Sequence, residues 1–303
     1  DRYPSGACAG LATRIEEFGD KYIFLDVCDE FDADKYKKIV SIFNAVFDGE
    51  YLVSYSSFNR NSTDKVLVFY IGDGLYSSTY NGERYIDILN RRATDYFIKL
   101  THEKYKQKCG KMFGKQLLGI FSDEFHWGAL FTKELPSDCI NEKKVPYTYN
   151  LFDKFENEYG YKLQERLPEL FFIEKGKNFR QIAWQYVSLL QNMTLEAFVK
   201  PYYQWCNDNN LIFTGHLVGE DTLSTQSLQC GSVMRYYEYM TYPGVDVLCD
   251  YNLRGWVIKQ ASSVSKQLGK KYTVSECYGA TGYLMNFEKY RYLFDFNVVF
   301  GVN

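Results

Sequence analysis

The chain has 303 residues, of which 46% are hydrophobic, and its formal net charge at pH 7 is −3. This apolar content is enough for a full hydrophobic core, so the fold needs no disulfide bonds or structural metal. The charge is close to balanced and no cluster of Lys and Arg is interleaved with aromatic residues, which argues against a nucleic acid partner. No run reaches the ~18 apolar residues of a membrane span, so we expect no membrane partner.

Residues 20–72 differ in pattern from the rest of the chain. They hold three β-rich runs, 21–27, 51–58 and 65–71, and no long helix lies between them. The turn Phe47-Asp48-Gly49-Glu50 is a hairpin signal. We therefore predict a small antiparallel β insertion near the N-terminus.

After residue 81, predicted helices alternate with short apolar strands. The predicted parallel strands cover 117–122, 211–214, 245–249, 272–275 and 297–301. Buried parallel strands that are connected by helices are typical of a (β/α)8 barrel, but such a barrel needs eight strands. The sequence thus predicts an α/β fold, a (β/α)8 TIM-type barrel that is incomplete at both ends, with residues 1–303 as a partial catalytic domain around the insertion.

Three of the apolar runs end in a carboxylate or an imidazole. Asp123 and Glu124 follow the first, His216 follows the second with Glu220 four residues later, and Glu276 ends the third. In a barrel, the C-terminal ends of the strands meet at one rim, so we expect these side chains around one pocket. The alternative for each acid alone is an ordinary helix N-cap, and His216 could be a histidine that only supports the rim.

The segment Asp123-Glu124-Phe125-His126-Trp127 brings two acids, an imidazole and an indole into five residues. Carboxylates bind sugar hydroxyls, and aromatic faces stack on the C–H surface of a pyranose. We therefore predict that Asp123, His126, Trp127 and His216 bind a carbohydrate substrate.

The eight cysteines form no C-x-x-C pair and have no histidine at the spacing of a zinc site. We interpret them as free thiols in a reducing compartment. Cys277 next to Glu276 could be a nucleophile, but no histidine lies near it in the sequence.

Several short motifs, taken in order, resemble the bacterial α-L-rhamnosidases of glycoside hydrolase family 106. They are Tyr3-Pro4-Ser5-Gly6, Thr101-His102-Glu103, Gly119-Ile120-Phe121-Ser122-Asp123-Glu124, Thr214-Gly215-His216, Pro243-Gly244-Val245-Asp246, Ser275-Glu276 and Gly301-Val302-Asn303. The resemblance covers most of the chain except residues 20–72. It implies a (β/α)8 catalytic barrel, inverting hydrolysis of L-rhamnosides, and a calcium ion that helps to hold the sugar hydroxyls.

An inverting glycosidase needs one carboxylic acid that protonates the leaving oxygen and one carboxylate that activates water. We assign Glu124 as the acid, because its aromatic neighbours and Asp123 would raise its pKa, and Glu276 as the base. Glu220 could be a calcium ligand or the base itself.

Two other functions stay open. A retaining glycosidase of the same architecture would use one of the two acids as a nucleophile. A non-catalytic carbohydrate-binding barrel would tolerate one of the acids paired with Arg or Lys. The chain starts at Asp1 within what resembles a site loop, so we expect the true N-terminus and accessory domains to lie outside it. The location of the protein in a bacterium, cytoplasmic or periplasmic or extracellular, stays undetermined.

Overall fold

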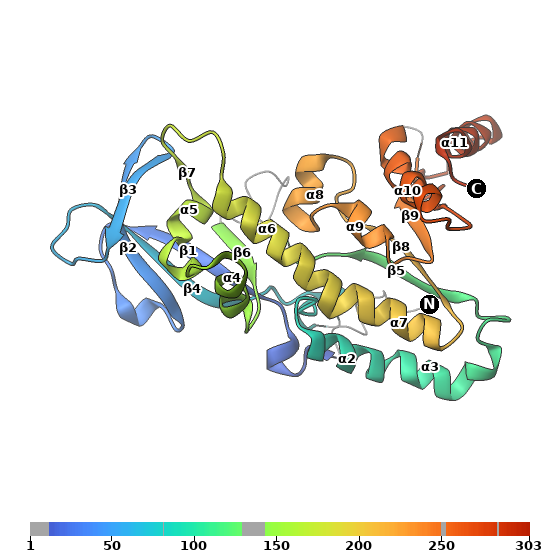
Figure 1. The fold of residues 1–303 in the computed structure, drawn as a ribbon, viewed down its shortest axis with the longest axis horizontal. Helices are drawn as coiled ribbons and strands as arrows, with labels where there is room; N and C mark the ends of the chain where they lie inside the picture. The colour runs from blue at the N-terminus through green and yellow to red at the C-terminus, as the bar shows by residue number, and fades with distance from the viewer. Residues whose placement is uncertain (1–11, 81, 129–142, 250–252, 284) are drawn as a thin grey trace.

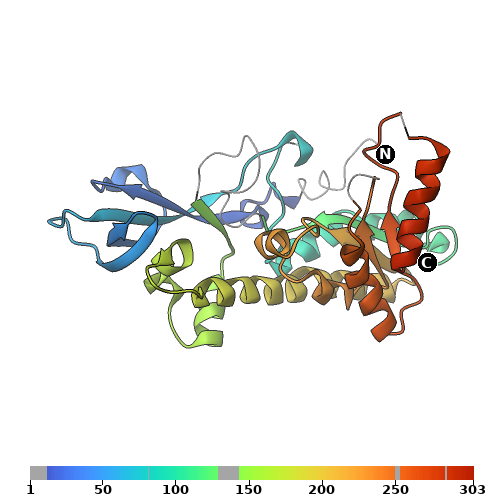
Figure 2. The same ribbon diagram turned by 90° about the horizontal axis from the view of Figure 1, so that it is seen from above.

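A computed structural model describes residues 12–80, 82–128, 143–249, 253–283 and 285–303. The described chain contains a six-stranded sheet and a separate four-stranded sheet. A long helical segment runs from one sheet to the other along one side of the molecule (Figures 1 and 2).

The six-stranded sheet has the strand order β6-β1-β4-β2-β3-β7. Neighbouring strands are antiparallel except β3 and β7, which pair in parallel. Gly49, at φ +60°, allows the tight turn between β2 and β3. The strands are β1 (Lys21–Cys28), β2 (Ile39–Asp48), β3 (Tyr51–Ser57), β4 (Lys65–Asp73), β6 (Lys143–Tyr147) and β7 (Ile173–Glu174).

The four-stranded sheet is parallel and has the order β10-β9-β8-β5, so the strands lie in the sheet in the same order as along the chain, although β6 and β7 of the other sheet come between β5 and β8. All four therefore direct their C-terminal ends to the same edge, where the side chains that follow them can meet. The strands are β5 (Gly119–Phe125), β8 (Ile212–Leu217), β9 (Tyr242–Asp246) and β10 (Val274–Glu276).

Helices connect and cover these sheets. The longest helical segment joins α6 to α7 through one π-helical turn at Leu195–Val199. From this turn, Phe198 packs on Phe125 at the end of β5, with ring centroids 5.1 Å apart. The α-helices are α2 (Arg91–Leu100), α3 (His102–Cys109), α4 (Leu151–Tyr159), α5 (Leu167–Phe171), α6 (Gln181–Thr194), α7 (Lys200–Asp208), α8 (Leu223–Gln229), α9 (Val233–Tyr237), α10 (Gly255–Gln267) and α11 (Phe287–Phe300). Short 3-10 turns lie at Glu16–Phe18, Ala33–Lys35, Ser78–Tyr80, Gly110–Met112 and Leu163–Glu165.

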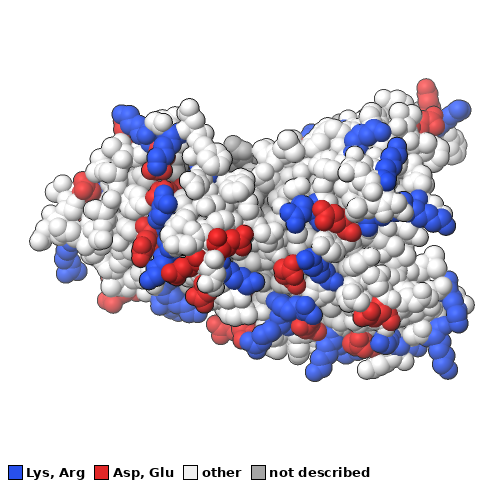
Figure 3. Space-filling model, in the orientation of Figure 1, with Lys and Arg blue, Asp and Glu red and all other residues white. Residues whose placement is uncertain are grey.

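The face of the molecule in Figure 3 carries basic and acidic side chains interspersed with each other. Among the described helices, none is long and apolar enough to cross a lipid bilayer.

The predicted (β/α)8 barrel, incomplete at both ends, is wrong. The described part of the chain has four strands in an open parallel sheet, in which β5 and β10 are edge strands, beside a second sheet of a different kind. Four of the five predicted parallel strands are present in that sheet, with shifted ends. The fifth, 297–301, belongs instead to α11, which Asn286 caps by accepting the backbone N–H of Lys289 at 3.0 Å.

The antiparallel sheet is larger than the insertion predicted at residues 20–72. Residues 20–72 supply strands β1 to β4, but β6 and β7 come from later parts of the chain and extend the same sheet at both edges. Long-range pairing of this kind leaves no local signal in the sequence, because β6 and β7 are short and begin 70 and 100 residues after the end of β4.

Candidate functional site

The site begins with an irregularity at the end of β5. Ser122 pairs with Gly215 of β8, and Phe125 pairs with Leu217, so the register shifts between them. Asp123 and Glu124 therefore face the single residue between Gly215 and Leu217, which is His216. A bulge of this type re-aims side chains, and it is common next to active sites.

Close backbone contact fixes this bulge. Gly215 has φ +155°, and a Cβ atom on it would lie only 2.0 Å from the carbonyl oxygen of Ser122. Glu124 has φ +44°, in the left-handed region that a residue with a side chain rarely adopts. Such strained positions persist where surrounding structure holds them, and they concentrate at functional sites.

His216 connects the ends of three strands. Its side chain is only 2% exposed, and its Nε2 lies 2.8 Å from Oε2 of Glu276 and 3.1 Å from Oδ1 of Asp123. The two carboxylates are about half exposed, with side-chain exposures of 53% for Asp123 and 46% for Glu276. The structure thus joins Asp123, His216 and Glu276, which the sequence predicted for one site.

The surrounding charges change the protonation of this site. Burial opposes protonation of His216, but its bond to Glu276 and the carboxylates of Glu220, Asp246 and Asp123 raise its pKa above the usual value. The acids around His216 therefore favour its protonated form, whose positive charge would balance part of their negative charge.

The pKa of Glu124 is raised as well. Partial burial raises its pKa, and the charges of Asp123 and Glu276 raise it further, against the lowering effect of His216. A carboxyl group with a raised pKa keeps its proton closer to neutral pH, as a general acid requires.

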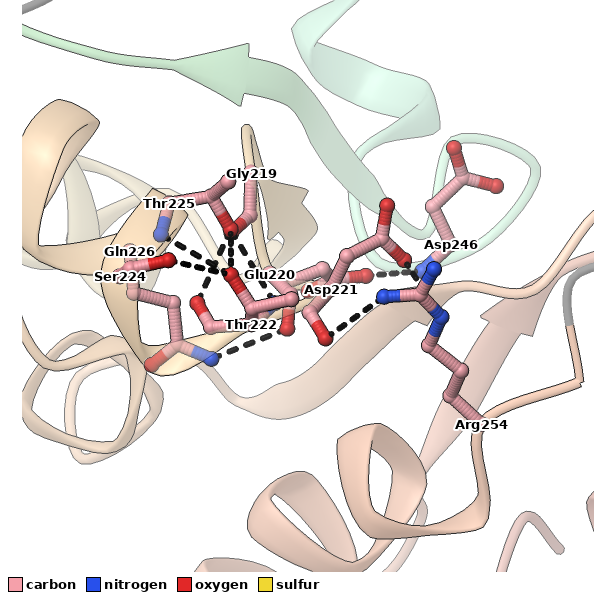
Figure 4. A network of polar contacts seen from close by, with 9 residues as sticks. All are labelled: Gly219, Glu220, Asp221, Thr222, Ser224, Thr225, Gln226, Asp246 and Arg254. Atoms are coloured by element: carbon pink, nitrogen blue, oxygen red, sulfur yellow. Dashed lines mark hydrogen bonds and ion pairs between the residues drawn. The ribbon is translucent and has the colours of Figure 1, made fainter. Parts of the chain in front are cut away.

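Glu220 lies behind the site in a buried position, 5% exposed. Its Oε1 accepts the backbone N–H of Asp246, the last residue of β9 (Figure 4). Its Oε2 accepts the hydroxyl of Tyr237 at 3.1 Å. Burial raises the pKa of Glu220 to about 7. Both oxygens accept hydrogen bonds within the protein, so Glu220 holds the end of β9 and the side chain of Tyr237 together.

Asp246 also belongs to this site, although the motif Pro243-Gly244-Val245-Asp246 alone predicts no role for it. It pairs with Glu276 across β9 and β10, and one of its carboxylate oxygens lies within 4.8 Å of a ring nitrogen of His216 and an oxygen of Glu124. Burial raises its pKa to about 6, and the charges of Glu276 and Glu124 add to this effect. It follows the same pattern of an apolar strand that ends in an acid, so this signal was present in the sequence.

His126 and Trp127 lie in packed surroundings. Trp127 is 4% exposed and belongs to the hydrophobic core. The ring of His126 stacks on Tyr85 at 4.6 Å, its Nδ1 accepts the N–H of Gly128, and burial lowers its pKa to about 4. Stacking on a sugar needs an exposed ring face, and the aromatic ring beside His216 that has one is Phe121, 45% exposed and 5.4 Å from the imidazole.

The site can be compared with what calcium requires. Asp123, His216 and Glu276 offer ligand atoms within 4.8 Å of one another, but Nε2 of His216 already bonds both carboxylates. Calcium prefers six to eight oxygen ligands. The contacts of Asp123 and Glu276 with the ring of His216 fit a protonated histidine better than a calcium ion.

No family model matches this chain, and no curated protein matches it. Its fold is similar to that of a solved structure of a rhamnosidase from Novosphingobium sp. PP1Y, with a TM-score of 0.55 and 13% sequence identity. The similarity covers 81% of this chain and 23% of the rhamnosidase chain, so this chain spans less than a quarter of that protein's length. At this identity the comparison shows a shared fold, and the described chain is therefore similar in fold to a part of a rhamnosidase.

Proposed function

We propose that the protein is a glycoside hydrolase that removes a terminal α-L-rhamnosyl or related deoxyhexosyl residue from a plant polysaccharide or glycoside. One observation carries this proposal. The β5 bulge sets Asp123 and Glu124 opposite His216, and His216 bonds Glu276 at the end of a different strand. The fold similarity to a rhamnosidase supports the choice of sugar, and membership of family 106 stays a prediction from the sequence motifs.

In the proposed mechanism, Glu124 is the general acid. Its raised pKa favours the protonated carboxyl group, which transfers its proton to the glycosidic oxygen as the bond to the anomeric carbon breaks. Glu276 is the general base, which takes a proton from the water molecule that attacks the opposite face of the sugar. The product then has the inverted configuration.

His216 and Asp123 have supporting roles in this proposal. His216 donates its Nε2 proton to Glu276 and so fixes the orientation of the base. Asp123, half exposed next to Glu124, is placed to accept hydrogen bonds from sugar hydroxyls, which are the donors that a carboxylate recognises. Phe121 offers an exposed ring face for the apolar side of the sugar.

A non-catalytic sugar-binding protein is the competing proposal of another class. Such a protein would tolerate the acids locked by Arg or Lys. Within the described residues, the ion pairs of Asp123 and Glu276 are formed with His216 alone, and none involves Arg or Lys. This arrangement favours the enzyme.

A panel of nitrophenyl glycosides tests the proposal. We expect release of nitrophenol from the α-L-rhamnoside, with less or none from the D-glucoside, D-galactoside and L-fucoside. Binding of rhamnose without hydrolysis of any substrate in the panel would favour the non-catalytic alternative.

A further inference from the structure

The buried imidazole of His216 has two nitrogen atoms in different situations. Nε2 bonds Glu276 and Asp123. Nδ1 is buried as well, and no described residue forms a hydrogen bond with it. A buried polar atom without a partner destabilises the fold, so its surroundings should contain a group that can bind it.

Asp246 supplies the complementary atom. Its Oδ1 is buried and has no hydrogen-bond partner in the described parts of the chain. A ring nitrogen of His216 and a carboxylate oxygen of Asp246 lie within 4.8 Å of each other. A protonated imidazole has two N–H donors and a carboxylate has only acceptors, so each side chain offers what the other lacks.

The backbone of Asp246 is fixed from behind. Glu220 accepts its N–H, and Glu220 is itself held in a loop with many internal bonds (Figure 4). Gln226 donates to the carbonyl of Glu220 at 3.0 Å, and Arg254 donates to the carbonyl of Asp221 at 3.0 Å. Because the backbone of Asp246 is held in this way, a contact between the two side chains would have to come from rotation of the Asp246 carboxyl group or a tilt of the imidazole, and not from movement of the strands.

We propose that Asp246 is a positioning residue for His216, whose carboxylate accepts the Nδ1 proton while Nε2 donates to Glu276. The result is an array of carboxylate, imidazolium and carboxylate that spans β9, β8 and β10. Glu220 anchors this array through the backbone of Asp246. The inference goes beyond the proposed hydrolysis, because it concerns the protonation of His216 and holds whatever the substrate is.

The chain offers a direct measurement, because it has only three histidines. Burial lowers the pKa of His102 and His126 to about 4, whereas the carboxylates around His216 raise its pKa above the usual value. An NMR titration of histidine-labelled protein should therefore show one imidazole with a midpoint well separated from the other two.

Asp246→Ala should lower the midpoint of that imidazole by about one pH unit or more, because it removes both an acceptor and a negative charge. Asp246→Asn keeps an acceptor and should lower it less. Asp123, Glu124, Glu220 and Glu276 also face the ring and remain in both variants. The matched control is Asp221→Asn, which changes an acid in the same loop that pairs with Arg254 and should leave the midpoint in place.

An unchanged midpoint in both Asp246 variants would overturn the proposal, as would equal shifts in Asp246→Asn and Asp221→Asn. If Asp246→Ala does not fold, Asp246→Asn decides alone, because it has the same shape as the native side chain. The measurement needs no substrate, so its outcome is separate from that of the glycoside panel.

Discussion

Oε2 of Glu276 lies 2.8 Å from Nε2 of His216, although the two residues are 60 positions apart in the chain. The contact joins the end of β10 to the end of β8 across β9, which lies between them in the sheet. His216 is buried and Glu276 is half exposed, so the histidine fixes an acid that substrate and water can still reach. The proposed chemistry depends on this relationship.

Loss of the general acid should depend on the leaving group. We expect Glu124→Gln to reduce kcat by 10²–10⁴-fold for a methyl or phenyl rhamnoside, and far less for a dinitrophenyl rhamnoside, whose leaving group needs little protonation. Steady-state kinetics on the three substrates measure this. Equal losses on all of them would remove Glu124 from the role of the acid.

Substitution of His216 should affect activity and the pH profile together. His216→Asn leaves Asp123 and Glu276 without their partner, and we expect kcat to fall at least about tenfold, which corresponds to the ~1.4 kcal/mol or more of a hydrogen bond to a charged group. His102→Asn is a control, since it removes a buried histidine that bonds Tyr202 elsewhere in the fold. It should lower the melting temperature but leave the pH profile of activity in place. The same change of profile in both variants would count against a specific role of His216.

Gly215 should tolerate no side chain. Gly215→Ala places a Cβ atom against the carbonyl of Ser122 in the adjacent strand, and we expect a loss of about 1–3 kcal/mol of unfolding free energy together with loss of activity. Gly269→Ala is the matched control, because Gly269 has φ +64° but open space around it, and it should cost only about 1 kcal/mol. Urea denaturation of both variants makes the comparison. Equal losses would show that β5 and β8 can separate to make room.

Stability should fall as the pH rises from 4 to 7, in part through Asp87. Burial raises the pKa of Asp87 to about 7, while Thr148 donates to it at 2.6 Å. The folded protein then holds this proton more tightly than the unfolded chain, so the stabilisation is complete below about pH 3.8 and is lost as the pH approaches 7. Asp87→Asn should flatten the curve by up to about 1.4 kcal/mol per pH unit.

Denaturation midpoints at several pH values give these slopes. Glu288→Gln on exposed α11 serves as a control and should keep the native slope. A slope in Asp87→Asn equal to that of the wild type would mean that folding does not raise the pKa of Asp87.

The predicted calcium ion can be tested separately. If calcium holds the sugar hydroxyls through Glu220, excess chelator should raise KM or abolish activity, and added calcium should restore it. The bonds of Glu220 to Asp246 and Tyr237 instead suggest full activity in chelator. Glu220→Gln keeps an oxygen that can accept the N–H of Asp246. If Glu220 binds no calcium, this variant should therefore retain most of the activity.

The sequence predicted local features better than their assembly. Continuous apolar runs located the four parallel strands, since a strand buried on both faces leaves that pattern. The same pattern misplaced 297–301, because Val298 and Val299 are β-branched residues in the last turn of α11. The incomplete (β/α)8 barrel was inferred from five predicted strands, whereas the described residues place four strands in an open parallel sheet.

For the candidate site as well, the sequence predicted the positions of residues along the strands better than their packing. Asp123, His216 and Glu276 meet as predicted from their positions at strand ends, because parallel strands share one edge. The sequence has no signal for the bulge that turns Glu124, since it depends on the pairing of β5 with β8. The aromatic residue Trp127 was assigned by its proximity in sequence, whereas packing against the core decides where its ring lies.

The anomeric configuration of the first product tests the central claim most directly. Proton NMR of the reaction with a nitrophenyl α-L-rhamnoside should show β-L-rhamnose before mutarotation, and Glu276→Gln should lose this activity without rescue by azide as a retained product. Release of α-L-rhamnose first would establish a retaining enzyme. Wild-type turnover in Glu124→Gln and Glu276→Gln would contradict the account, because both glutamates would then lie outside the chemistry.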